Sequence, residues 1–190
     1  MLKKIIQKIK GRLGIPVQQG SETAKVRHLV LPWCKGLGAD VGFGGDKIQK
    51  ENCLGIDYAQ PYVYAGKDKV DIAVDLYKEL IPLPDNYFDY IYSSHLIEDF
   101  EDTKQILKEF IRLIKPGGNL ILVFPDQPKF EEHCRRTGQP LNPHHVHKDM
   151  GFTYMQNQME QIPVEKNLLF KSDCEIDYNV IMVYAITKNQ

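Results

Sequence analysis

Five short apolar segments, each followed by glycine, proline or polar residues, constrain the fold of this 190-residue chain more than any other feature. They predict strands at Gly38–Val41, Cys53–Asp57 and residues 71–75, 88–93 and 119–124. Residues 102–115 place apolar side chains on one helical face, and Pro116 and Gly117 end that helix. Strands alternating with helices predict βαβ units with right-handed crossovers, and hence an α/β fold with a doubly wound, mostly parallel, Rossmann-like sheet.

The end of the chain completes this sheet. Residues 125–149 are polar and predict a long loop, and residues 149–160 predict a helix. The β-rich segments 167–171 and Asn179–Thr187 predict a terminal antiparallel strand pair. We therefore expect seven strands in one sheet, with segment 119–124 near its centre because that strand is apolar almost throughout.

Residues 1–24 differ from the predicted domain at 25–190. Residues 1–12 carry five basic side chains and no acidic one, with apolar residues at helical spacing, which predicts a basic amphipathic helix. Gly14, Pro16 and Gly20 separate this helix from the body. Two interpretations stay open. Residues 1–13 contact an anionic membrane surface at its inner, cytoplasmic face, or the helix belongs to the body, where it either covers the ligand site or simply packs on the surface.

Composition limits the partners. The net charge of −1 argues against a surface that coats nucleic acid, because phosphate binding depends on an excess of Lys and Arg. The four cysteines form no CxxC pair, so neither a zinc ribbon nor a dense disulfide framework is expected. No run approaches the roughly 18 apolar residues that span a bilayer. We expect a soluble, cytoplasmic protein with one folded domain.

Two turns at predicted strand ends carry the first functional signal. In an open α/β sheet, ligands bind beyond the carboxyl ends of the strands, where the strand order reverses. The first strand runs into a glycine-rich turn at residues 42–45, and the second ends at Asp57, whose carboxylate can accept hydrogen bonds from both ribose hydroxyls. A dinucleotide fingerprint would need a third glycine where Lys47 stands, which argues against a nicotinamide oxidoreductase.

Four ordered motifs between residues 36 and 125 resemble class I S-adenosylmethionine-dependent methyltransferases. Residues 40–44 (DVGFG) resemble the family's first motif, and residues 75–89 resemble the stretch beside the adenine. Residues 93–99 (SSHLIED) resemble the turn after the fourth strand, and residues 113–120 (LIKPGGNL) the connection into the fifth. The resemblance implies a methyltransferase with S-adenosylmethionine as its cofactor.

The resemblance also implies roles for individual residues. Its cofactor-binding set is Asp40, Gly42, Phe43, Gly44, Asp57, Tyr58, Asp75, Leu76, Ser94 and His95. In this set, the turn from Gly42 to Gly44 borders the amino acid portion, Asp57 holds the ribose and Tyr58 lies against adenine. Asp75 and Leu76 flank the base, Ser94 and His95 face the sulfonium and the acceptor, and Asp40 lies beside the cofactor's positive end. Phe43 departs from the family pattern, and its ring either narrows the methionine pocket or turns into the core.

Methyl transfer to a hydroxyl or an ammonium group needs a base, and five residues are candidates: His95, Asp126, His144, His145 and His147. His95 follows the fourth strand and Asp126 the fifth. The three clustered histidines have three interpretations: acid–base or substrate contact, a divalent metal with Asp126 as a fellow ligand, or a loop that enters a helix capped by Asp149. No partner carboxylate stands at tight spacing, and we assign no metal ligands.

Only about 40 residues separate the fifth strand from the terminal strands, so we expect no separate substrate domain and a shallow pocket. We expect a small-molecule or glycan-type acceptor, methylated at oxygen, such as those of surface polysaccharide biosynthesis. The alternative is a non-catalytic methyltransferase-like scaffold, which Phe43 favours and Asp57 opposes. The sequence does not indicate the acceptor's identity or the oligomeric state.

Overall fold

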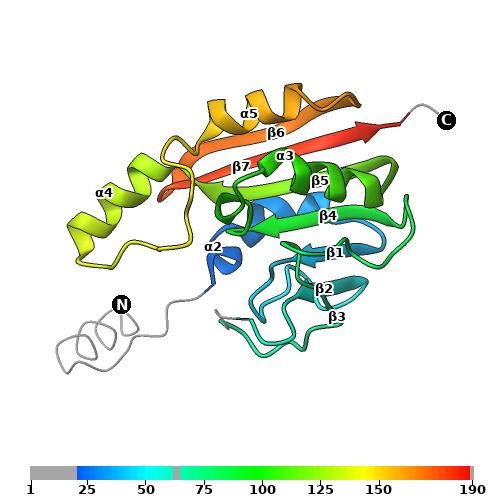
Figure 1. The fold of residues 1–190 in the computed structure, drawn as a ribbon, viewed down its shortest axis with the longest axis horizontal. Helices are drawn as coiled ribbons and strands as arrows, with labels where there is room; N and C mark the ends of the chain where they lie inside the picture. The colour runs from blue at the N-terminus through cyan, green and yellow to red at the C-terminus, as the bar shows by residue number, and fades with distance from the viewer. Residues whose placement is uncertain (1–20, 62–64, 189–190) are drawn as a thin grey trace.

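The computed structural model describes residues 21–61 and 65–188, which form a single seven-stranded sheet with helices on both faces (Figure 1). The strand order is β3-β2-β1-β4-β5-β7-β6. The strands are β1 (Gly38–Val41), β2 (Cys53–Asp57), β3 (Ile72–Ala73), β4 (Phe88–Ser94), β5 (Ile114–Pro125), β6 (Glu165–Ile176) and β7 (Asn179–Thr187). The first five strands in this order, β3, β2, β1, β4 and β5, are parallel to their neighbours, whereas β7 is antiparallel to both β5 and β6. The predicted fold class, strand number and terminal antiparallel pair are confirmed.

Four α-helices and two short 3-10 turns accompany the described sheet. They are α2 (Glu22–Val30), α3 (Thr103–Leu113), α4 (Gln127–Thr137), α5 (Phe152–Glu160), η1 (Leu31–Trp33) and η2 (Ile97–Asp99). Helix α3 begins where Asp102 accepts the backbone N–H of Gln105, and α2 begins where Ser21 accepts that of Ala24. Helix α2 starts three residues before the expected domain boundary at residue 25 and packs directly on the sheet.

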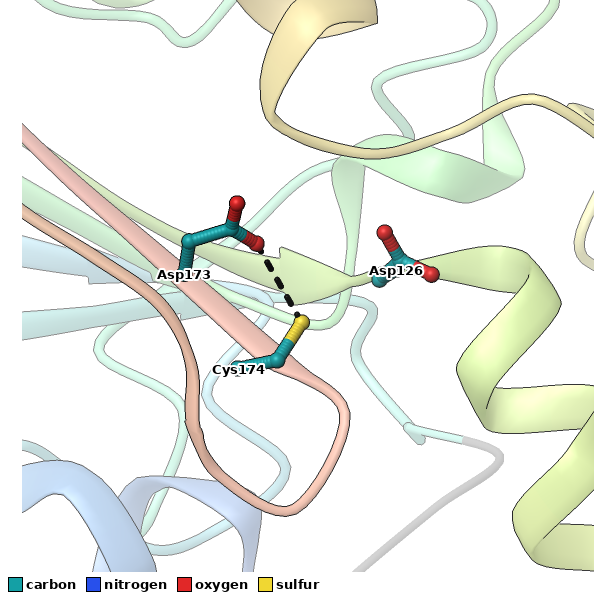
Figure 2. A group of neighbouring side chains, drawn as sticks. All are labelled: Asp126, Asp173 and Cys174. Carbon is teal, nitrogen blue, oxygen red and sulfur yellow. Dashed lines mark hydrogen bonds between the residues drawn. The ribbon is translucent and has the colours of Figure 1, made fainter.

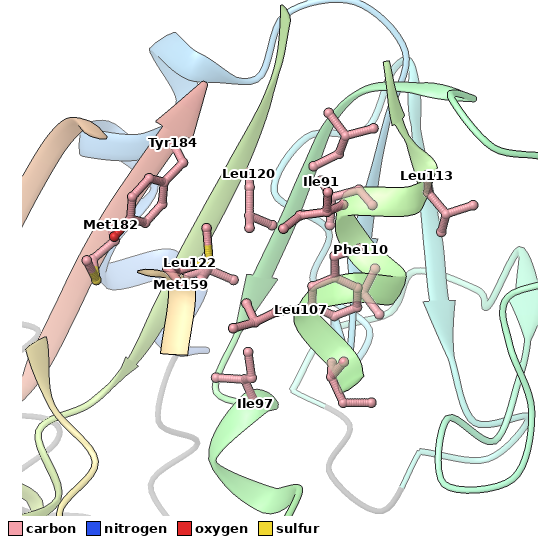
Figure 3. Close-up of a cluster of buried hydrophobic side chains, with 14 of the residues drawn as sticks. Ile91, Ile97, Leu107, Phe110, Leu113, Leu120, Leu122, Met159, Met182 and Tyr184 are labelled. Atoms are coloured by element: carbon pink, nitrogen blue, oxygen red, sulfur yellow. The ribbon is translucent and has the colours of Figure 1, made fainter. Parts of the chain in front are cut away.

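Side chains alternate across the sheet and divide the core into two layers. Ile91, Leu120 and Met182 face α3 and α5, in the cluster that Figure 3 shows around Phe110 and Met159. The intervening residues face the opposite side, where Val26 and Val30 of α2 cover Tyr90, Tyr92, Ile121, Val123, Ile181 and Val183. The second half of β5, Leu120–Phe124, is buried on both faces of the sheet, which explains why that run is apolar throughout.

Helix α4 corrects the predicted loop over residues 125–149. Asp126 caps it by accepting the N–H of Lys129, Pro128 stands in its first turn, and Gly138 ends it at φ +73°. Only Gln127 and Cys134 of this helix are buried, so the sequence has no apolar stripe that would predict it. The next helix also begins later than expected: its N-cap is Gly151, and Asp149 does not cap it.

From β1 the strands are added toward one edge of the sheet as far as β3, and from β4 they are added toward the other edge. The carboxyl ends of β1 and β4 therefore form the topological switch point. The connections β1–β2 and β2–β3 are loops in the described residues, so the helical layers cover mainly the β4–β7 half. No helix among the described residues is long and apolar enough to cross a membrane. The amphipathic helix predicted for residues 1–13 lies outside the described residues and stays a prediction.

Candidate functional site

Two adjoining cavities open at the switch point and share Gly42, Asp57 and Leu96. The first cavity, of about 300 Å³, is mostly apolar and is lined by Ile56, Tyr58, Val74, Leu76, Tyr77, Asp99, Phe100 and His144. The second, of about 360 Å³, has charged walls, with Glu22, Phe43, Gly44, Ser94, His95, Phe130, Gln139, Asn142, His145 and Tyr178 among its lining residues. A ligand that contacts Gly42 and Asp57 can therefore extend into both cavities.

The glycine turn after β1 brings backbone close to this shared wall. Gly42 has φ +73°, and a Cβ there would come within 2.8 Å of the Leu96 side chain, so a larger residue is excluded. Asp57 accepts the N–H of Gly44 at 3.0 Å through Oδ2 and that of Tyr58 at 2.7 Å through Oδ1. Each carboxylate oxygen has a second lone pair, so Asp57 can also accept ligand hydroxyls. Burial raises the pKa of Asp57, and the two amide hydrogen bonds oppose that rise.

Two residues of the first motif support the turn from within the protein. Asp40 is fully buried and lines neither cavity; its Oδ2 accepts the N–H of Ile48 at 2.6 Å and so fixes the far side of the loop. The Phe43 ring packs over Gly55 of β2, where a Cβ would lie 2.8 Å from the ring. Gly55 thus provides the space for this large residue, and the ring lies against the β2 backbone at the edge of the second cavity.

The predicted adenine-side residues gather at the first cavity. Tyr58 and Leu76 line it, while Asp75 lies behind them and accepts the Tyr58 hydroxyl at 3.2 Å. Burial, together with the nearby Asp75 carboxylate, raises the pKa of Tyr58 to about 12. Tyr77 stacks on Phe100 with ring centroids 4.4 Å apart, which adds an aromatic wall that the sequence interpretation missed.

His95 occupies the sharp turn after β4, at φ +52°, and lines the second cavity beside Ser94. Its Nε2 donates to Asn179 Oδ1 at 2.6 Å, because Asn179 Nδ2 donates to Glu22 and so turns the amide oxygen toward the ring. Its Nδ1 lies 3.3 Å from Glu98 Oε1. Burial alone would lower the pKa of His95, but the hydrogen bond and charge of Glu98 and the charge of Glu22 outweigh it and raise the pKa to about 9.

His145 has the opposite protonation tendency on the same cavity. Its Nδ1 donates to Gln127 Oε1 at 2.8 Å, and Gln127 Nε2 donates to Glu131, which orients the amide. Its Nε2 lies 3.6 Å from Glu98 Oε1. Burial lowers the pKa of His145, although the Glu98 charge opposes this. A histidine that is neutral near pH 7 is a suitable general base.

The two neighbouring histidines lie elsewhere. His144 is exposed and lines the first cavity. His147 lines neither cavity; its Nε2 donates to the carbonyl oxygen of Phe100 at 2.7 Å and lies 3.1 Å from Thr103 Oγ1. His147 therefore fastens the loop to the start of α3. The hypothesis that these three histidines share one metal finds no support, since the loop directs them to different partners.

Asp126 lies apart from both cavities, at the N-cap of α4. Figure 2 shows it facing Asp173 and Cys174, and the candidate ligand atoms of the three lie within 4.8 Å of one another. Cys174 donates to Asp173 Oδ1 at 3.4 Å, and one Asp126 oxygen already accepts the Lys129 N–H. We assign this group neither a metal nor a role as base, because nothing around it indicates a ligand.

Sequence interpretation missed Glu22, Glu98 and Tyr178. The Tyr178 hydroxyl donates to Glu22 Oε1 at 3.0 Å, which connects the start of α2 to the turn before β7. Glu98 is fully buried behind the two histidines. The spacing of His95 and Glu98, three residues apart, is a signal that was present; the contact between Glu22 and Tyr178 has no local sequence signal.

Comparison with known proteins relates the middle of this chain to methyltransferases. Residues 39–122 match the family model described as "Methyltransferase domain". Curated relatives include demethylmenaquinone methyltransferases from Listeria welshimeri, 31% identical over 120 residues, and from Bacillus mycoides, 31% identical over 119 residues. Each match covers 59% of this chain and 48% of the relative, so the chain spans about half the length of these relatives.

Solved structures agree in fold. A SAM-dependent methyltransferase from Thermotoga maritima has a TM-score of 0.64 at 18% identity, with 90% of this chain and 91% of that chain covered. Another from Archaeoglobus fulgidus has a TM-score of 0.60 at 16% identity, with 86% and 92% covered. These findings confirm the resemblance to class I S-adenosylmethionine-dependent methyltransferases. The family and fold imply S-adenosylmethionine as the cofactor.

Proposed function

We propose that the protein transfers the methyl group of S-adenosylmethionine to a hydroxyl of a small polyhydroxylated acceptor, such as a sugar residue of a glycan. The observation that carries the proposal is the pair of adjoining cavities, apolar on one side and charged on the other, which meet at Gly42 and Asp57. The methyl donor would occupy their junction, and the acceptor would enter the charged cavity.

The shared wall suits the donor. Asp57 offers carboxylate lone pairs to the ribose hydroxyls, and the apolar first cavity, with Tyr58 and Leu76, suits the adenine. The turn at Gly42 and Gly44 brings main chain to the methionine portion without side chains in the way. Bound there, the cofactor would supply an electrophilic methyl group.

The second cavity suits a sugar-like acceptor. Phe130 and Tyr178 pack edge to face, with ring centroids 5.1 Å apart, and give the cavity an aromatic wall against which a sugar ring can stack. Gln139, Asn142 and Glu22 line the same cavity and offer amide and carboxylate groups to neighbouring hydroxyls. An aromatic surface beside several hydrogen-bonding side chains favours an acceptor with both a flat apolar face and a polar edge.

His145 would act as the base. The acceptor oxygen forms a bond to the methyl carbon, the carbon–sulfur bond breaks with its electron pair left on sulfur, and the hydroxyl proton passes to His145. Holding the reactants aligned can remove about 7 to 11 kcal/mol of the barrier in favourable cases. A positioned base contributes about 10² to 10⁴ in rate.

A second candidate acceptor comes from the relatives. Their names assign them demethylmenaquinone, whose ring system is flat, and the Phe130–Tyr178 wall also suits a flat ring. The polar groups of the second cavity are more numerous than such an acceptor needs, so we favour the sugar. Attachment to a membrane through residues 1–13, and work on surface polysaccharide in the cytoplasm, belong to the same proposal.

The proposal is tested by following S-adenosylhomocysteine formation with a panel of mono- and oligosaccharides, nucleotide sugars and reduced naphthoquinones. Turnover restricted to saccharides supports the proposed acceptor, whereas turnover restricted to quinols supports the second candidate. A protein that binds the cofactor firmly and turns over no member of the panel, while it retains a partner protein when Asp57→Ala has removed cofactor binding, supports the scaffold alternative.

A further inference from the structure

Glu98 lies between His95 and His145, the two histidines of the second cavity, and takes no direct part in the proposed methyl transfer. It belongs to η2 and is fully buried, and within the described part of the chain its carboxylate oxygens accept no regular hydrogen bond from any residue other than His95. Its Oε1 lies 3.3 Å from His95 Nδ1 and 3.6 Å from His145 Nε2. A buried carboxylate is costly unless a positive group balances it, so its neighbours must share its charge.

We propose that Glu98 is a positioning residue that fixes the protonation states of both histidines, keeping His95 as an imidazolium and stabilising the proton that His145 receives from the acceptor. The chemical role rests on the proposed function. The protonation states do not, because they are properties of the protein without ligands.

The surroundings of His95 favour its charged form. Both ring nitrogens face acceptors, Glu98 on one side and Asn179 on the other, and a doubly donating imidazole is cationic. A second carboxylate, Glu22, lies 3.8 Å from Nε2 and is itself held by Lys25 at 2.8 Å. The Tyr178 ring packs edge-on against His95. Charges from α2 and η2 thus bracket the ring.

The surroundings of His145 favour its neutral form until a proton arrives. Oε1 of Gln127, in α4, accepts a hydrogen bond from the Nδ1–H of His145, so Nε2 carries the lone pair and faces Glu98. The ring also packs against Phe130 at a centroid distance of 4.8 Å, and His95 and His144 lie near enough to oppose its protonation. A proton that reaches Nε2 would gain Glu98 as its hydrogen-bond acceptor.

The backbone couples the same elements. The Val146 N–H donates to the carbonyl oxygen of Glu98 at 3.1 Å, one residue after His145. The backbone of the loop that carries His145 is therefore hydrogen-bonded to the segment that carries Glu98. Loss of the Glu98 charge should then change both histidines at once, whereas a purely structural role would change neither titration.

Carbon-13 labelling of the histidine rings allows the six histidines to be titrated by NMR between pH 5 and 10, with assignments from single substitutions. In the unsubstituted protein we expect His95 to titrate near pH 9 and His145 below 6.5. Glu98→Gln should lower the His95 midpoint by at least one pH unit and lower that of His145 as well. Glu98→Asp, which retains the charge, should restore part of both shifts.

Glu101→Gln, an exposed acid close by in sequence, is the matched control and should leave both midpoints unchanged. If Glu98→Gln fails to fold, the unsubstituted protein still decides, because a His95 midpoint at or below about 6.5 or a His145 midpoint above it would overturn the inference. Unchanged titration of both histidines in folded Glu98→Gln would overturn the inference. Binding of S-adenosylhomocysteine is measured separately, so its absence would count against the proposed function and leave the titration result intact.

Discussion

The two cavities differ in where their residues come from. Every lining residue of the first cavity except His144 lies within residues 39–122, the segment that matches the methyltransferase family model. The second cavity also takes residues from that segment, among them Phe43, Gly44 and His95, but adds residues of α2, α4, the loop after it and the turn before β7, which lie outside the segment. Under the proposed function, the donor would bind mainly against the matched segment, and acceptor specificity would depend on the residues outside it.

The difference also concerns electrostatics. The first cavity is lined by two carboxylates, Asp57 and Asp99, and is otherwise mainly apolar. In the second, two carboxylates and two histidines lie within 4 Å of one another in series, from Glu22 through His95 and Glu98 to His145. Binding of the donor and chemistry on the acceptor should therefore respond separately to substitution and to pH.

The largest effect that separates the two cavities is expected from His145→Gln. Removal of the base should lower kcat by about 10² to 10⁴. The affinity for S-adenosylhomocysteine should stay within a factor of about three, because His145 lines only the second cavity. Steady-state kinetics and calorimetry measure the two quantities. His28→Gln, on the exposed side of α2, is the control. Loss of cofactor binding in His145→Gln would mean that the two cavities act as one binding site.

Phe43→Ala tests whether the residue that departs from the family pattern is structural. Its ring is buried over Gly55, so truncation should cost about 3 kcal/mol of unfolding free energy, as for other buried phenylalanines. Chemical denaturation measures this loss, and Phe43→Leu should cost clearly less. Stability close to that of the unsubstituted protein, together with tighter cofactor binding, would instead mean that the ring obstructs the methionine pocket.

His95 links the second cavity to global stability through pH. Its pKa is about 9 in the folded protein and near 6.5 in an unfolded chain, so its stabilisation is complete below pH 6.5 and is lost as pH rises to about 9. The loss for this group is on the order of 3 kcal/mol. Urea unfolding at several pH values should show it in the unsubstituted protein and not in His95→Asn, a variant suited to the left-handed backbone there. Equal pH slopes in both proteins would contradict this assignment.

The smallest effect is expected from His147→Gln, which weakens the attachment of the loop to Phe100 and Thr103. Loss of one buried hydrogen bond should cost about 1 kcal/mol. Thermal unfolding measures that cost, and KM for the acceptor should rise while kcat changes little. A large fall in kcat would give His147 a direct part in the chemistry.

The sequence predicted the order and approximate position of the strands because these depend on local patterns, such as the apolar run Leu120–Phe124 in β5. It also placed Gly42, Asp57, Tyr58 and Leu76 at one sheet edge, where they line the first cavity, because each ends or follows a predicted strand. Helix α4 was missed because Phe130 and Cys134 are too few apolar side chains to form a clear apolar stripe in a segment that is otherwise mostly polar. Glu22 and Asn179 were missed because they are 157 residues apart and only the fold brings them together.

Among the five candidate bases, position in the sequence could not distinguish residues that face the cavity from those that fasten a loop or cap a helix. His145 and His147 stand two residues apart, yet one lines the second cavity and the other holds the carbonyl of Phe100. Asp126 follows β5 as expected, but its side chain caps α4. Side-chain direction in irregular segments depends on tertiary contacts, which no local pattern encodes.

Calorimetric titration with S-adenosylhomocysteine, of the unsubstituted protein and of Asp57→Ala, tests the donor site most directly. Asp85→Asn, which alters an exposed carboxylate just before the amino end of β4, serves as the control. We predict micromolar binding in the unsubstituted protein and in the control, weakened at least 100-fold in Asp57→Ala. No binding at millimolar ligand, or equal binding in all three proteins, would contradict the assignment of the shared wall at Gly42 and Asp57 as the cofactor site.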